Sequence, residues 1–165
     1  MATIKELLTS TAGYTFVNAS GANSLAGLAN NASWQTTYQD NSTNLWLDAL
    51  VQLKVKTGAS GTSATGVVWV YAYGSVDGAT YPDTVTGAEG TLTLVSPTNL
   101  RPIGSVNTPA NAATYTSEPI SVAAAFGGTL PLRWGLCLVN NAGAALDATI
   151  GSFAILIGGI QTQVV

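Results

Sequence analysis

Residues 66–74 constrain the fold more than any other stretch of the sequence. Read with a period of two, one face of a strand here carries bulky residues: Val67, Trp69, Tyr71 and Tyr73. The other face carries small apolar residues: Val68, Val70 and Ala72. β-Branched and aromatic residues favour a pleated, packed surface, and a strand with two apolar faces is typically covered on both sides. We therefore expect a central strand of a β-sandwich, with its aromatic side filling the core.

The clearest alternation of the chain lies at residues 45–56. Apolar residues recur at every second position: Leu45, Leu47, Ala49, Val51, Leu53 and Val55. The opposite face ends in Gln52, Lys54 and Lys56, which predicts a long strand with one buried and one partly wet face. A Gly/Ser/Thr-rich loop at 57–65 follows, so we expect this strand and 66–74 to pair as an antiparallel hairpin.

Further short strands are predicted along the chain at 91–95, 100–106, 120–126, 132–139 and 153–164. Turn residues separate them, as at Asp77-Gly78. About eight strands with this spacing of turns, and no sustained helical periodicity after residue 10, indicate an all-β fold. We predict a single-domain antiparallel β-sandwich, jelly-roll-like, over residues 11–165.

Residues 1–10 are predicted to form a short N-terminal arm. Ile4, Leu7 and Leu8 have helix-like spacing, but so few residues do not form a stable free helix. One helical turn and an extended arm that orders on a neighbouring subunit both remain open.

The composition indicates an unusually neutral surface. Charged residues make up only 8% of the chain, against about 25% in typical soluble domains. Such a surface costs little to bury in an assembly. Two interpretations follow: a neutral protein of a secreted or crowded environment, or a subunit packed against copies of itself. We favour the second.

Charge and hydropathy exclude several partners. The formal net charge is −3 with no basic run, so binding to nucleic acid through counterion release is not expected. No apolar run approaches the roughly 20 residues that span a bilayer, so no membrane partner is expected. The N-terminus lacks the apolar core of a signal peptide, and we expect synthesis in a cytoplasm. The single cysteine, Cys137, forms no internal disulfide and is expected to be a small buried residue.

The sequence contains no recognisable catalytic constellation. There is no histidine, which removes the common Ser-His-Asp and Cys-His arrangements. A pair of carboxylates could still act on a glycosidic bond, and the candidates are Asp48, Asp77, Asp83, Glu89, Glu118 and Asp147. None lies in a motif, so solvated loop carboxylates are the favoured interpretation. We expect no enzyme activity, no catalytic residues, no metal and no cofactor.

Aromatic residues offer one alternative, because a stacked row of them can bind sugars. Trp69, Tyr71 and Tyr73 share a face, but we interpret them as core. Residues at predicted strand ends or in loops are the candidate surface contacts: Trp34, Trp46 and Tyr81.

With these strands placed, the chain resembles the small all-β virion proteins of tailed bacteriophages. The resemblance lies in four segments within residues 44–150: 66–74, 81–87, 119–128 and 134–141. It implies a jelly-roll-like sandwich that decorates or cements a capsid, or forms part of a tail. The implied partners are the major capsid protein or tail proteins, and copies of the chain itself, with a trimer favoured over a dimer. No functional residue can be carried across, because this family has no catalytic motif to match.

The leading hypothesis is therefore a non-enzymatic virion structural protein, a capsid decoration or cement subunit made in the cytoplasm of a bacterial host. The alternative is a tail-associated or carbohydrate-binding β-sandwich module.

Overall fold

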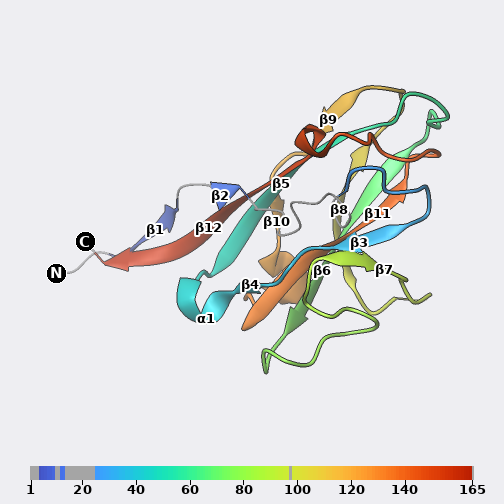
Figure 1. Ribbon diagram of the computed structural model, residues 1–165. Helices are drawn as coiled ribbons and strands as arrows, with labels where there is room; N and C mark the ends of the chain where they lie inside the picture. The colour runs from blue at the N-terminus through green and yellow to red at the C-terminus, as the bar shows by residue number, and fades with distance from the viewer. Residues whose placement is uncertain (1–3, 10–11, 14–24, 97, 165) are drawn as a thin grey trace.

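A computed structural model describes residues 4–9, 12–13, 25–96 and 98–164. These residues form two antiparallel sheets with six strands each (Figure 1). The predicted all-β antiparallel sandwich is thus confirmed, whereas this strand order does not confirm the finer expectation of a jelly roll. Strands outnumber the expected eight because several have only two or three residues, too few to produce a visible alternation.

The first sheet is built around the C-terminal strand. Its path is β1 (Ile4–Leu8), β12 (Ala154–Val164), β5 (Asp48–Lys56) and β10 (Ile120–Ser121), with β2 (Ala12–Gly13) against β12 and β9 (Thr114–Thr116) against β5. β12 has 11 residues and β5 has nine. β1 is a strand and not a helical turn, so the helical alternative for the N-terminal arm is wrong; residues 1–3 and 10 lie outside the described residues.

The second sheet is built around two long strands, β11 and β6. Its path is β7 (Gly90–Leu92), β3 (Ser33–Gln35), β11 (Arg133–Asn141), β6 (Val67–Ser75) and β8 (Arg101–Asn107), with β4 (Gln39–Asp40) against β11. β6 pairs with β11 along its whole length. The expected hairpin between β5 and β6 is wrong, because the connection between them crosses from one sheet to the other.

Within the described ranges, three short helical segments connect the strands: α1 (Asn41–Asn44), η1 (Ala123–Phe126) and η2 (Ile150–Ser152). The Asp40 carboxylate caps α1 by accepting the Ser42 N–H, and Leu45 ends it with φ 52°. The strand expected at 120–126 is wrong beyond Ser121. There the chain turns into η1, which ends at Gly127 with φ 78°.

The alternation of β5 produces the core as predicted. Ala49, Val51, Leu53 and Val55 are fully buried between the sheets. Leu45 and Leu47, expected on the same face, are exposed instead, because the chain turns through α1 immediately before β5 begins.

The aromatic face of β6 points the opposite way from our expectation. Its small face (Val68, Val70 and Ala72) lies in the core, where Trp34 and Trp134 from neighbouring strands already fill the volume between the sheets. The aromatic face lies on the outside of the second sheet. Part of it is covered there by a second apolar cluster in which Tyr73 and Cys137 pack against Val85 and Leu100.

Candidate interaction surfaces

The N- and C-terminal strands form a two-stranded ribbon that projects from the sandwich. β12 pairs with β5 over Ala154–Ile160 and with β1 over Ile160–Val164. Figure 1 shows β1 and the end of β12 extending together beyond the rest of the fold. Beyond Ile160, the described part of the chain supplies no third strand to this ribbon. A two-stranded hairpin alone is marginally stable in water, so a further surface would stabilise it.

The ribbon exposes large apolar side chains on both of its faces. Ile4 is 71% exposed, Leu7 is 41% exposed and Leu8 is 55% exposed. Alternation places Ile4 and Leu8 on one face with Glu6, and Leu7 on the other with Lys5. β1 is also an edge strand, whose outer backbone groups are a template for pairing with another chain.

A small apolar hollow continues this surface onto the outer face of the first sheet. Its volume is about 110 Å³, and it is lined by Leu8, Leu50, Val51, Gln52, Pro119 and Gly158. Leu156, opposite Gln52 on the neighbouring strand, is 40% exposed. The outer face of a sandwich sheet is usually polar, so this apolar stretch is a candidate contact with another protein.

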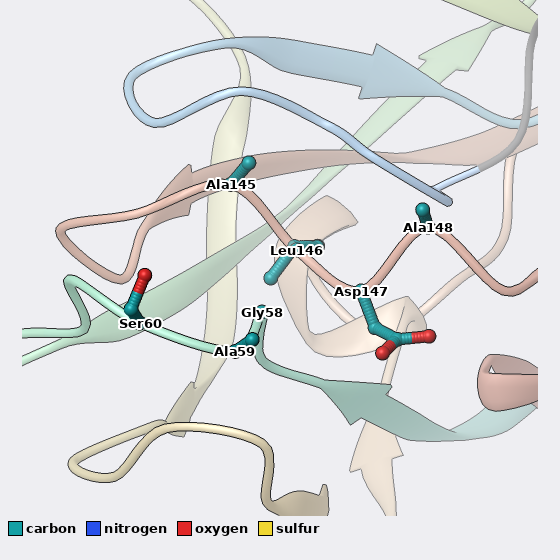
Figure 2. Close-up of a pocket in the computed structure, with 7 residues that line it drawn as sticks. All are labelled: Gly58, Ala59, Ser60, Ala145, Leu146, Asp147 and Ala148. Atoms are coloured by element: carbon teal, nitrogen blue, oxygen red, sulfur yellow. The ribbon is translucent and has the colours of Figure 1, made fainter.

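A more open cleft of about 410 Å³ lies at one end of the sandwich (Figure 2). Its walls are the loop after β5 (Gly58, Ala59 and Ser60) and residues 145–148. Asp147 is the charged residue in this lining, and its carboxylate is held by the Thr149 N–H, the Ser152 hydroxyl and Lys56 Nζ at 3.2 Å. These hydrogen bonds, first of all that from the Thr149 N–H, lower the pKa of Asp147 to about 2. The carboxylate therefore organises its own loop.

Other candidate carboxylates have the same structural role. Asp77 accepts the Ala79 and Thr80 N–H groups and the Ser75 hydroxyl, and these bonds, with the Ser75 hydroxyl foremost, hold its pKa well below the usual range. Asp83 is held similarly by the Thr98 hydroxyl and by Asn99, which lower its pKa.

Asp48 joins two elements of the first sheet. Its carboxylate accepts the Ala123 N–H and the Ser121 hydroxyl. In these four cases, the carboxylates considered as possible acids or bases are hydrogen-bond acceptors that hold turns, loops or neighbouring segments in place. Across the described ranges, no three His, Cys, Asp or Glu side chains come close enough together to hold a metal ion.

The structure corrects the proposed set of surface aromatics. Trp34 is completely buried, because β3 is covered on its inner side by the opposite sheet. Trp46 is only partly exposed and packs against the core. Tyr81 is also partly exposed, and its ring contacts Tyr73 edge to face with 5.7 Å between centroids. The structure does not bring these three residues together into one platform.

Trp69 is the surface aromatic that sequence reasoning missed. It lies on β6 with 42% of its surface exposed. The signal was present in the alternation, because Trp69 must face away from Val68 and Val70. What the sequence did not reveal is which of the two apolar faces lies inside.

No protein-family model, curated protein or solved structure matches this chain. The described residues include no helix long and apolar enough to cross a membrane.

Proposed function

We propose that this protein is a non-enzymatic structural subunit of a tailed bacteriophage particle, a decoration or cement subunit that binds the major capsid protein and stabilises the head. The observation that carries the proposal is the β1–β12 ribbon, an ordered edge that exposes Ile4, Leu7 and Leu8. The low charge of the chain supports the same proposal, because neutral polar surface is inexpensive to bury.

The mechanism we propose is apolar burial repeated by symmetry. Fully burying one Leu or Ile side chain contributes about 1.5–3 kcal/mol. Covering the three partly exposed side chains of one ribbon therefore contributes roughly 2–5 kcal/mol before the entropic cost of association. Such a contact is weak alone, but several copies on one symmetric assembly bind together with much higher avidity.

The assembly we propose is a homo-oligomer located in the virion after synthesis in the bacterial cytoplasm. A trimer is favoured over a dimer, because the resembling proteins often occupy threefold positions of a capsid. The edge of β1 provides the means of association, through addition of its unpaired backbone groups to a strand of a neighbouring subunit.

Co-sedimentation with capsids tests this proposal. Heads assembled from the major capsid protein of the same genome are mixed with the purified protein and pelleted. The proposal predicts saturable binding, and heads with bound protein should resist disassembly by heat or by a chelator better than bare heads. A Leu7→Ser, Leu8→Ser double variant should bind less, whereas Val76→Ser, an exposed apolar residue outside the ribbon, should bind normally. Binding to tail assemblies instead of heads would support the tail-associated alternative, and binding to neither would contradict the proposal.

A further inference from the structure

The outer face of the second sheet carries one exposed indole in an otherwise well-ordered setting. Trp69 is the third residue of β6. β6 pairs with β11 on one side and with β8 on the other (Figure 1). Its backbone is therefore fixed by strands on both sides. An exposed Trp on such a rigid strand is a preformed contact, because little conformational entropy is lost when a ligand covers it.

The fold does not need this side chain for its core. The inner face of β6 supplies the packing between the sheets, and the neighbouring Tyr73 on the outer face is 1% exposed beneath the second apolar cluster. Tyr71, between them, is partly covered. The second apolar cluster thus covers Tyr73 and part of Tyr71 but leaves Trp69 exposed at its edge.

The residues around Trp69 are neutral, and several can form hydrogen bonds. Ser105 of β8 and Val139 of β11 lie directly opposite Trp69. Val67, two residues before Trp69 on β6, points to the same face, and Asn107 and Asn141 lie opposite it on the two neighbouring strands. Ser105, Asn107 and Asn141 are exposed. The indole is thus bordered on both neighbouring strands by hydroxyl or amide groups, and none of these residues carries a charge.

We propose that this face, formed by Trp69 with Ser105, Asn107 and Asn141, binds neutral carbohydrate. A pyranose ring has an apolar C–H face, which stacks on an aromatic ring, and a rim of hydroxyls, which hydrogen-bond to amides and to Ser. A charged ligand would find no counter-charge among these residues, and a purely apolar ligand would leave the amide and hydroxyl groups uncovered. The site offers a single exposed indole for stacking, so its affinity for a single chain is weak and is raised by multivalency in an oligomer.

The site is independent of the ribbon and of the proposed virion role, because it lies on the opposite sheet. Each subunit carries one such face, so a particle with many subunits would present many sugar-binding faces. The ligand class is a neutral oligosaccharide, whether free or part of a cell-surface polysaccharide.

A titration with defined oligosaccharides tests this inference. Cellohexaose, maltoheptaose and chitohexaose are added to the whole protein, and binding is followed by tryptophan fluorescence and by calorimetry. We expect saturable binding of at least one of them. Trp69→Thr, which keeps a strand-forming residue, should lower the affinity about tenfold or more, whereas Trp69→Tyr should retain most of it. Circular dichroism shows that both variants are folded.

Any of four results would overturn the inference. One is the absence of binding to all three neutral oligosaccharides. Another is binding that Trp69→Thr leaves unchanged. The third is a change in the mass of the oligomer in solution on Trp69→Thr without any sugar binding. That result would identify this face as a contact between proteins. Polygalacturonate serves as the charged control, and a preference for it over the neutral chains would also contradict the proposed ligand class. Immobilised polysaccharide compared with the free oligosaccharides distinguishes the two sources.

Discussion

The indole of Trp46 occupies the space beside Gly159 that a side chain on that residue would need. A Cβ built on Gly159 would overlap the Trp46 ring atoms. This contact fixes the start of β5 against β12 at the base of the ribbon, next to the point where β12 exchanges β5 for β1 as its partner. The position of the ribbon therefore depends on a glycine.

Replacing Gly159 by Ala should destabilise the fold. The added methyl must displace the indole, and overpacking of this kind costs about 1–3 kcal/mol. At this chain length each kcal/mol lowers the Tm by about 2–4 °C, which thermal denaturation would detect. Gly151→Ala is the matched control, because a Cβ there meets no atom within 4 Å. Equal Tm values for the two variants would contradict the role given to this contact.

The carboxylates that hold loops should make the protein sensitive to acid. The pKa of Asp147 is lowered from 3.8 to about 2, and that of Asp77 is lowered further. A carboxyl whose pKa is lower in the folded state stabilises the fold above its unfolded pKa, and this stabilisation is lost as the pH falls through the folded pKa. Stability should therefore fall between about pH 4 and pH 2.

Variants at Asp147 check this expectation. Asp147→Asn should lower stability at neutral pH and flatten the acid limb of a plot of unfolding free energy against pH. Glu118→Gln removes the same charge from an exposed side chain and is the matched control for the change in net charge. An acid limb identical in all three proteins would contradict the role of Asp147.

Cys137 should be inert in the folded protein. It is completely buried, and desolvation raises the pKa of its thiol to about 12. Since the thiolate is the reactive form, a disulfide reagent such as DTNB should react only as fast as the protein unfolds. The same reagent in guanidinium chloride gives the fully reactive reference. Rapid reaction under native conditions would show that the second apolar cluster opens easily.

Removing β1 should affect association more than folding. All five of its side chains are exposed in the single chain, so the sandwich loses little packing. A variant in which residues 1–8 are replaced by an initiator Met keeps Thr9, whose backbone N–H and hydroxyl donate to the Gly159 carbonyl. We expect reduced assembly with a small change in Tm. A large drop in Tm with unchanged assembly would instead place β1 within the essential fold.

The sequence was sufficient to predict the buried residues of strands in which only one face is apolar. The alternation in β5 identified the buried residues correctly, since only one of its faces is apolar throughout. In β6 both faces are apolar, so alternation could not decide which one lies inside, and Trp69 was assigned to the core. That choice depended on the volume already filled by Trp34 and Trp134, which belong to other strands and become neighbours only in the folded chain.

Local sequence pattern also could not predict which strands pair with one another. A Gly/Ser-rich connection between two strands suits a hairpin and a crossing between sheets equally well, and β5 and β6 take the second course. The projecting ribbon could not be predicted from local sequence pattern either. It is formed by Ile4–Leu8 and the end of β12 at opposite ends of the sequence, and β1 is too short to show a strand period.

Solution mass, measured by multi-angle light scattering over a dilution series, tests whether the protein associates with itself through the ribbon. We expect an oligomer, three chains in preference to two, that persists on dilution and dissociates in the Leu7→Ser, Leu8→Ser variant. A monomer at every concentration, identical in the wild type and the variant, would contradict self-association through the ribbon.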